Sequence, residues 1–406
     1  MKWLRNNIIR LVLLAFFSLL ALGYGFNAVF FGHQVQTHFP DLLPRLSPLL
    51  NLGGAIAMRR FLGWAMLLGI PLLILPFFKG RFFCWKICPM GFLAETASRI
   101  NPNKTLIRKI PYINRWLTLV LVVTAICGYP LIIWLDPLCI FNGFFATWRQ
   151  PLTWVAATTG IGFVTILLLS VAVPNIWCHR LCPLGGLEEA LTIFAQRIKQ
   201  RASKTGKPEA VVSRRTVLAA LPAGLAGIAG SFCGAANAGT VIRPPSADPA
   251  RFNAVCARCG NCMRACPYGL LLPDLGESGI DGLFTPVVHF RSKNPDQEDF
   301  CFHDCTKCSE VCPTGALKPL TVEQKHATPI GVAEVNRNLC IAWAKGEYCA
   351  VCDEYCPYKA VQLEKNGEVN CPIVNADLCR GCGACESQCP AQPIAIRVQP
   401  LKKPSA

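Results

Sequence analysis

Sixteen of the chain's 24 cysteines fall in four groups that share one spacing, and a proline closes each group. The first and fourth groups follow C-x2-C-x2-C-x3-C-P, and the second and third widen only the first gap. Three thiolates two residues apart can wrap a loop around three corners of an iron–sulfur cubane, with backbone amides directed at the sulfurs. The groups are Cys256, Cys259, Cys262 and Cys266; Cys301, Cys305, Cys308 and Cys312; Cys340, Cys349, Cys352 and Cys356; and Cys379, Cys382, Cys385 and Cys389.

This spacing is typical of bacterial ferredoxins, in which the fourth cysteine of a group ligates the partner cluster of a two-cluster module. Zinc sites more often use separated C-x2-C pairs, and a disulfide framework is the alternative for a cysteine-rich exported domain. Runs of four with a closing proline favour neither, so we predict four [4Fe-4S] clusters with exchanged fourth ligands. The predicted sets are Cys256, Cys259, Cys262 with Cys312; Cys301, Cys305, Cys308 with Cys266; Cys340, Cys349, Cys352 with Cys389; and Cys379, Cys382, Cys385 with Cys356.

The N-terminal half contains a shorter cysteine motif twice. FFCWKICPMGFLAE and IWCHRLCPLGGLEE share six identities at a constant offset of 94 residues. Parallel repeats usually pack around a common axis, so we expect the two motifs to face each other. Three interpretations stay open for their cysteines: a further Fe–S cluster, a thiol or disulfide relay, and a purely structural role. The four residues are Cys84, Cys88, Cys178 and Cys182.

Five apolar stretches could supply the helices that position these motifs, since a membrane span takes about 20 residues. They are roughly residues 11–31, 61–78, 116–135, 154–176 and 217–236. The excess of Lys and Arg between them places the N-terminus in the cytoplasm and the region beyond about residue 238 in the periplasm of a bacterial inner membrane protein. The predicted fold is an α-helical membrane domain of four internally repeated helices plus a fifth signal-anchor helix, followed by a small α+β polyferredoxin domain.

The predicted boundaries follow changes in composition. Residues 1–212 form the membrane domain, 213–238 the signal or anchor, 239–250 a linker and 251–400 the polyferredoxin domain. Residues 1–215 carry 23 Lys and Arg against 6 Asp and Glu, whereas the remainder carries 17 against 18. The net charge of +16 therefore belongs to the apolar half. Basic residues that flank membrane spans explain such a charge, which argues against nucleic acid as a partner.

Four polar residues at the predicted outer ends of the spans are candidates for a quinol region. Histidine titrates near neutral pH and could accept protons from a quinol. Ordinary polar residues at a membrane interface are the alternative interpretation for each of them. The candidates are His33, His38, Asp41 and Asp136.

An export signal appears in the middle of the chain. Ser213-Arg214-Arg215 precedes an apolar run, and Ala236-Asn237-Ala238 follows it like a cleavage site. Paired arginines before an apolar segment are typical of the twin-arginine route. Cleavage after Ala238 and retention as an anchor both remain open.

These motifs resemble a known family. The N-terminal half with FCWKICPMG and WCHRLCPLG resembles NapH and its relative MauN, and the segment from Ser213 onward resembles NapG and MauM. The chain thus resembles a NapH-like protein fused to a NapG-like one. Residues 183–213 contain no cysteine, which departs from the additional cytoplasmic ferredoxin motifs that NapH-like proteins usually carry.

The resemblance implies that electrons pass from the quinone pool at the membrane to a periplasmic reductase or cytochrome. The sequence shows no P-loop, dinucleotide fingerprint or catalytic triad, so a partner must supply the terminal reductase chemistry. The chain would then be a component of a quinol dehydrogenase, and its own status as an enzyme stays open. The alternative is a NosR-like or CcoG-like role in maturation or regulation of a periplasmic metalloenzyme.

Overall fold

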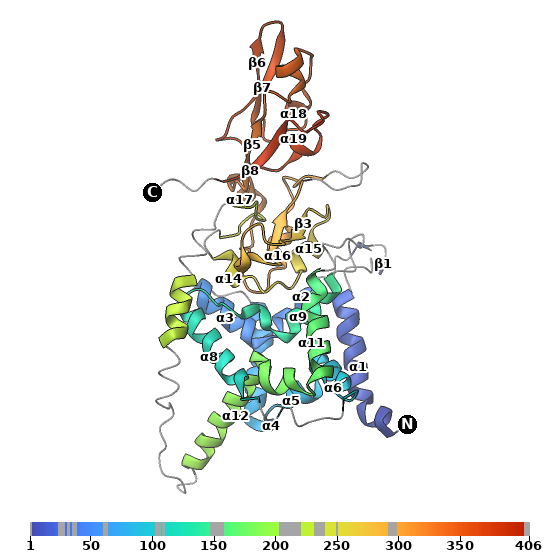
Figure 1. Ribbon diagram of the computed structural model, residues 1–406, viewed down its shortest axis with the longest axis vertical. Coiled ribbons are helices and arrows are strands. Elements are labelled where there is room, and N and C mark those ends of the chain that lie inside the picture. The colour runs from blue at the N-terminus through green and yellow to red at the C-terminus, as the bar shows by residue number, and fades with distance from the viewer. Residues whose placement is uncertain are drawn as a thin grey trace. The chain divides into compact units, whose positions relative to one another are not determined.

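The computed structural model describes residues 2–22, 29–30, 33–34, 39–59, 64–101, 107, 110–146, 158–202, 221–230, 240–248, 251–290 and 299–401. The chain folds into two compact units, whose elements are labelled in Figure 1. The first unit consists of residues 1–235, 251–261 and 313–316, and the second of residues 236–250, 262–312 and 317–406. This division assigns Cys256 and Cys259 to the first unit and the other cysteines of the four groups to the second.

The first unit is mainly helical in its described residues (Figure 1). A short antiparallel pair joins β1 (Val29–Phe30) to β2 (His33–Gln34), with Val29 opposite Gln34. The α-helices are α1 (Lys2–Leu22), α2 (Phe39–Arg45), α3 (Pro48–Met58), α4 (Ile70–Lys79), α5 (Phe82–Lys86), α6 (Pro89–Ala97), α8 (Ile113–Ile126), α9 (Pro137–Ala146), α11 (Ile161–Ala172), α12 (Pro183–Ala202) and α14 (Phe252–Val255). Short 3₁₀ helices form η1 (Trp64–Gly69), η2 (Ile133–Leu135) and η3 (Thr158–Gly160), and a π-helical turn forms η4 (Trp177–Leu181).

Within the described residues, no helix combines the length and the apolar character needed to cross a bilayer. The predicted helical membrane domain, with its four spans and signal anchor, is therefore wrong. The apolar stretches are interrupted where they were expected to continue. Within residues 116–135, α8 ends at Ile126, and Gly128 with a φ of 86° turns the chain before the separate turn η2. Residues 61–78 are divided between η1 and α4, and α4 contains Pro76, which removes a backbone hydrogen-bond donor.

The predicted signal or anchor is only partly described. Residues 221–230 are helical. Residues 213–220 and 231–238, which include the paired arginines and the expected cleavage site, lie outside the described residues.

Two helix starts are joined by one hydrogen bond in the core of the first unit. The Ser47 hydroxyl begins α3 by accepting the N–H of Leu50 at 3.5 Å and donates to the Asp136 carboxylate at 2.5 Å. Asp136 in turn begins α9 by accepting the N–H groups of Leu138 and Cys139 at 2.9 and 3.1 Å. Because buried side-chain oxygens are satisfied in this way, the starts of α3 and α9 can lie inside an apolar core.

The second unit consists of short helices and two-stranded antiparallel sheets in its described residues (Figure 1). Strand β3 (Leu271–Pro273) pairs with β4 (Pro286–Val288), β5 (Gly331–Val335) with β8 (Ile396–Pro400), and β6 (Val361–Asn366) with β7 (Val369–Val374). Ala333 lies opposite Val398, so the β5–β8 pair closes a segment of more than sixty residues. The helices are α15 (Asn261–Ala265), α16 (Lys307–Glu310), α17 (Val322–Ala327), α18 (Val351–Glu354) and α19 (Ala384–Ser387), with η5 (Ile280–Gly282) and η6 (Ile341–Lys345).

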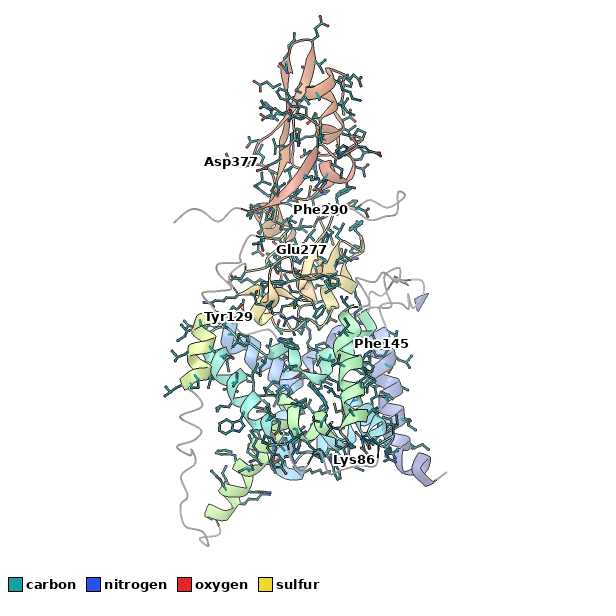
Figure 2. All side chains as sticks on the ribbon, in the orientation of Figure 1. Lys86, Tyr129, Phe145, Glu277, Phe290 and Asp377 are labelled. Carbon is teal, nitrogen blue, oxygen red and sulfur yellow. The ribbon has the colours of Figure 1, made fainter. Side chains whose placement is uncertain are left out.

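Cysteines form part of the core of the second unit. Cys352, Cys379 and Cys385 are buried together with strand residues such as Val361 and Val398. Figure 2 shows the described side chains on the ribbon, including Phe290, which belongs to the same core. Strands this short bury little apolar surface, so the core depends on whatever the cysteines bind.

Candidate metal centres

Two cavities in the second unit are each lined by four cysteines. Cys340, Cys349, Cys352 and Cys389 line one cavity. Cys356, Cys379, Cys382 and Cys385 line the other. In both cavities three cysteines come from one group and the fourth from the other group. The structure thus brings together the two sets that exchanged fourth ligands require.

The remaining walls of these cavities fit an iron–sulfur cluster. Apart from the cysteines, the lining is mainly alanine, valine, isoleucine, proline and glycine, and it contains no carboxylate. Backbone N–H groups point at the sulfurs, from Ala333 to Cys379 Sγ at 3.4 Å and from Ala360 to Cys356 Sγ at 3.3 Å. Such N–H···S bonds stabilise negative charge on cluster sulfurs.

The thiols of these cavities are held in surroundings that disfavour their charged form. Among the described residues, no group of three His, Cys, Asp or Glu side chains is arranged to share one metal ion. Burial, the largest cause, raises the pKa of Cys352 and of Cys382 to about 12. These thiols therefore need a bound metal to hold them as thiolates near neutral pH.

Glycines allow the fourth group's loop to turn tightly. Gly381 and Gly383 have φ values of 67° and 82°, in the left-handed region that favours glycine. A Cβ on Gly383 would lie 2.0 Å from Cδ1 of Phe290, so the ring packs directly on the loop backbone. Both glycines separate cysteines that line the same cavity.

The second group also meets a cysteine of its neighbour. Burial raises the pKa of Cys308, and the charges of Cys301, Cys266 and Cys305 raise it further, in that order. Cys266 therefore lies within electrostatic reach of the thiols of the second group, as the exchanged arrangement requires. Backbone N–H groups of Leu270 and other residues of its turn are directed at its sulfur.

The second group is hydrogen-bonded to the fourth, and α19 of the fourth group packs on α18 of the third. The N–H of Cys301 donates to the carbonyl oxygen of Cys382 at 2.8 Å. Burial, the largest cause, raises the pKa of Tyr358, and the charges of both thiols raise it further. Cys385 of the fourth group is in turn close enough to Cys352 of the third for that thiol to raise its pKa, after the larger effect of burial.

The first two cysteines of the first group, Cys256 and Cys259, pack within the first unit. Asn142 on α9 donates its side-chain N–H to the carbonyl oxygen of Cys259 at 2.9 Å. The Cys259 side chain is part of the same buried cluster as Leu138 and Phe141 of α9. The N-terminal half of the chain therefore packs directly against part of a ferredoxin motif.

The two short motifs of the N-terminal half also meet. Cys88 precedes α6 and Cys182 precedes α12, and each sulfur accepts a backbone N–H three residues later, from Gly91 and Gly185, at 3.4 Å. Cys88 lies within electrostatic reach of Cys178, and Cys84 of Cys182. The structure thus brings the thiols of the two copies together, as their repeat predicts.

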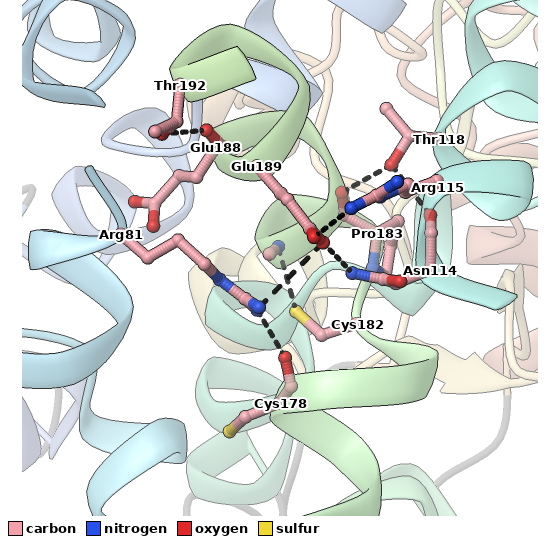
Figure 3. Close-up of polar contacts among 11 residues, drawn as sticks. Arg81, Asn114, Arg115, Thr118, Cys178, Cys182, Pro183, Glu188, Glu189 and Thr192 are labelled. Carbon is pink, nitrogen blue, oxygen red and sulfur yellow. Dashed lines mark hydrogen bonds and ion pairs between the residues drawn. The ribbon is translucent and has the colours of Figure 1, made fainter. Parts of the chain in front are cut away.

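A network of polar and charged side chains lies beside Cys178 and Cys182 of the second copy (Figure 3). Arg81 donates to the carbonyl oxygen of Cys178 at 2.5 Å and lies 3.9 Å from Glu189. Glu189 is held further by Arg115 at 2.5 Å and by Asn114 at 3.1 Å. These bonds connect the segment before α5, the start of α8 and the start of α12, so they fix the two cysteine motifs relative to each other.

Models of iron–sulfur families match the chain over both cysteine regions. A 4Fe-4S dicluster domain matches residues 255–317, and a 4Fe-4S binding domain matches residues 372–395. A further 4Fe-4S binding domain matches residues 61–111 and again residues 155–201. All three descriptions name the 4Fe-4S cofactor, so both halves of the chain resemble Fe–S proteins.

Curated relatives narrow the family. The methylamine utilization ferredoxin-type protein MauM of Methylophilus methylotrophus is 37% identical over 174 residues, which is 41% of this chain and 73% of MauM. MauM of Methylorubrum extorquens is 39% identical over 39% of this chain and 72% of its own length. The ferredoxin-type protein NapG of Escherichia coli is 34% identical over 40% of this chain and 72% of NapG. This chain belongs to the MauM/NapG family of ferredoxin-type proteins. No solved structure matches it.

In this MauM/NapG-family chain, the structure describes the side chain of one of the four candidate quinol residues, Asp136. Asp136 is fully buried, and burial raises its pKa to about 6 although three hydrogen bonds oppose that shift. His33 lies in β2, but its side chain, like that of Asp41, is not among the described parts. His38 lies outside the described residues. Asp136 instead lies at the start of α9, beside Cys139.

Three functional candidates were not singled out by the sequence, although Glu188 lies within the second copy of the short motif. Glu188 is buried beside Cys84, and burial raises its pKa to about 7. Cys139 is buried on α9 within reach of the Cys259 and Cys256 thiols. Lys325 is buried beside the second group. Their only sequence signal is an unusual residue type within an apolar or cysteine-rich segment.

Proposed function

We propose that this protein passes single electrons from a quinol to a periplasmic redox partner through its cysteine groups. The observation that carries the proposal is the succession of four-cysteine sites in the second unit. There the second group is hydrogen-bonded to the fourth, and α19 of the fourth packs on α18 of the third. A [4Fe-4S] cluster, when bound, takes up and gives up one electron without a change of bonds. Neighbouring sites of this kind have no evident use other than relaying charge.

The protein residues hold, insulate and tune these sites. Alanine, valine and isoleucine side chains keep water from the cavities of the third and fourth groups. Low polarity and N–H···S bonds set reduction potentials. The hydrogen bond from Cys301 to Cys382 fixes the spacing between two groups that belong to different motif pairs. Electrons would follow the spatial order rather than the order of the sequence.

The third group is the proposed exit. Its helix α18 packs on α19 of the fourth group, and its own loop carries exposed Tyr348, 76% accessible, next to Cys349. The surface groove beside it is lined by Asn336, Leu339 and Arg397 and shares Val335 and Ala395 with the cavity of the third group. A partner in this groove would lie one residue layer from the cavity.

The entry side of the proposal rests on α9. Part of the first group packs on this helix, where Asn142 holds the backbone of Cys259. Asp136 at the start of α9 remains a candidate for the quinol region. The paired arginines of residues 213–215 support export of the second unit to the periplasm. A NapH-like segment fused to the NapG-like part would combine donor and relay in one chain.

A fifth Fe–S site at Cys84, Cys88, Cys178 and Cys182 is part of the proposal. The match of a 4Fe-4S binding domain to both copies supports it, as do their converging thiols. Arg81 next to these thiols would offset part of the negative charge of such a site, whereas the buried Glu188 would have to stay protonated beside it.

Two measurements test the function. Purified protein should contain iron and acid-labile sulfide in equal amounts, and a reduced quinol analogue should produce the EPR signals of reduced clusters. Clusters that dithionite reduces but no quinol does would overturn the quinol donor and leave the relay intact. For the location, alkaline phosphatase fused after residue 401 should be active, because its disulfides form only in an oxidising compartment. An inactive fusion of normal abundance would contradict a periplasmic second unit.

A further inference from the structure

A lysine lies buried against the second cysteine group. Lys325 is only 4% exposed and is the fourth residue of α17. A capping box fixes this helix: Thr321 Oγ1 accepts the N–H of Gln324 at 3.3 Å, and Gln324 Oε1 accepts the N–H of Thr321 at 3.1 Å. The capping box therefore fixes the start of the helix that places the Lys325 ammonium in the interior.

The contacts of the ammonium all point to the second group. Nζ donates to the carbonyl oxygen of Cys305 at 2.7 Å and to that of Phe302. It also donates to the thiol of Cys301, whose pKa burial raises while the ammonium opposes that effect. The Phe302 ring stacks on Tyr268 with centroids 4.4 Å apart, which covers this face of the group.

Lys325 has no carboxylate partner among the described residues. Its acceptors there are two neutral carbonyl groups and a thiol. Lysine is almost never fully buried without a partner of opposite charge, because removing an ammonium from water costs several kcal/mol. The described residues therefore supply no counter-charge for Lys325, unless the four neighbouring cysteines bind as thiolates around a cluster.

We propose that Lys325 is the fixed counter-ion of the cluster held by Cys301, Cys305, Cys308 and Cys266, and that it raises the reduction potential of that cluster. The proposal rests on the function proposed above, because it requires a cluster in the second group. On reduction, one electron leaves the reduced neighbouring cluster, which becomes oxidised, and enters this one, with no bond or proton transferred. The added negative charge lies next to the ammonium, so the ammonium stabilises the reduced state more than the oxidised state.

A set of three variants tests this role in the full-length protein. Lys325→Met removes the charge and keeps the length of the side chain, whereas Lys325→Arg keeps the charge. Lys345→Met is the matched control, because Lys345 lies at the exposed end of η6 near the third group. Each protein is titrated with dithionite, and the EPR components of its clusters are followed as a function of potential.

We expect Lys325→Met to lower the equilibrium constant for reduction of one cluster at least tenfold, which is a shift of 59 mV for a one-electron couple. The other components should keep their midpoints, Lys345→Met should resemble the wild type, and Lys325→Arg should restore the midpoint. Unchanged midpoints in Lys325→Met with full iron and sulfide would overturn the proposal while the relay stands. If Lys325→Met loses iron, the test passes to Lys325→Arg. A midpoint potential of Lys325→Arg equal to that of the wild type supports the role of the charge. A midpoint potential lowered by 59 mV or more, despite the retained charge, overturns it. Wild-type protein without clusters would overturn the proposed function itself.

Discussion

The backbone N–H of Cys301 donates a 2.8 Å hydrogen bond to the carbonyl oxygen of Cys382. These residues are the first cysteine of the second group and the second cysteine of the fourth group. The bond therefore joins two ferredoxin motif pairs that are separate along the chain. It places the fourth group between the second and the third, because Cys385 also lies within reach of Cys352.

This order predicts the effect of losing the fourth group. Cys356→Ser should remove the cluster at Cys379, Cys382 and Cys385 and leave that of the third group in place, because Cys356 lines only the cavity of the fourth. The third cluster should then be reduced at least tenfold more slowly by a donor that enters through the first group. Iron content and rapid-freeze EPR measure both effects. Cys389→Ser is the matched control, and it should remove the third cluster alone. Loss of the third cluster in Cys356→Ser would argue for ligands taken from one motif only.

Tyr358 should protect the junction between the second and fourth groups. Its ring meets His326 edge-on with centroids 5.8 Å apart, and its hydroxyl feels the charges of Cys382 and Cys301. Truncating a fully buried aromatic residue costs roughly 3–5 kcal/mol, and since Tyr358 is only partly buried we expect Tyr358→Ala to lower the free energy of unfolding by about 2 kcal/mol. Water entering the gap should also shift the midpoints of both clusters. Tyr358→Phe keeps the ring and should change neither quantity much. Denaturant unfolding and redox titration measure the two quantities. Equal effects of Tyr358→Ala and Tyr358→Phe would contradict this role of the ring.

Gly383 and Gly367 form a pair that separates crowding from backbone strain. Both have positive φ, 82° and 69°, but a Cβ on Gly383 would lie 2.0 Å from the Phe290 ring, whereas a Cβ on Gly367 would meet nothing within 4 Å. We expect Gly367→Ala to cost about 1 kcal/mol from strain, and Gly383→Ala to cost about 3 kcal/mol or more because the ring must move. Iron should be lost only from Gly383→Ala. Chemical denaturation of the cluster-containing proteins measures the difference in unfolding free energy. Equal destabilisation of the two variants would show that the Phe290 ring can move aside without cost.

The cysteine sites were largely predictable from the sequence, because their ligands follow local spacing. Exchanged ligands follow from C-x2-C-x2-C-x3-C-P, and the structure brings together the sets around Cys352 and Cys385 as that rule requires. The facing of Cys88 and Cys178 follows from the repeat. These features depend on motifs within a few residues or on an exact internal offset, and both are visible without a fold.

The fold of the N-terminal half and several partners of the sites were not predictable in this way. Apolar composition indicated spans, but turns at positions such as Gly128 divide those stretches into shorter helices. Lys325, Glu188 and Cys139 reach the cysteines through tertiary packing, and a single buried polar residue has no periodic signal. The contact between Asn142 and Cys259 spans 117 residues, so no local pattern announces it.

Asp136 should make the stability of the protein depend on pH. Burial, the largest cause, raises its pKa from 3.8 to about 6. Below the unfolded pKa both states hold the proton and the carboxyl costs nothing. As pH rises through about 4 to 6, the unfolded state releases the proton first, so folding loses stability, and above the folded pKa the loss is complete. From pH 5 to pH 8 this amounts to about 1 kcal/mol, since one pKa unit corresponds to 1.36 kcal/mol.

Asp136→Asn isolates that contribution. The amide oxygen can still accept the N–H groups of Leu138 and Cys139, and the Ser47 hydroxyl can rotate to accept from the amide. The variant has no charge to ionise at this position, so its unfolding free energy relative to the wild type should rise by about 1 kcal/mol between pH 5 and pH 8. Urea unfolding of both proteins at several pH values gives this difference directly. A gap between the two proteins that stays constant with pH would mean that Asp136 ionises in the folded chain as readily as in the unfolded one, and the buried junction of α3 and α9 would then have to be open to water.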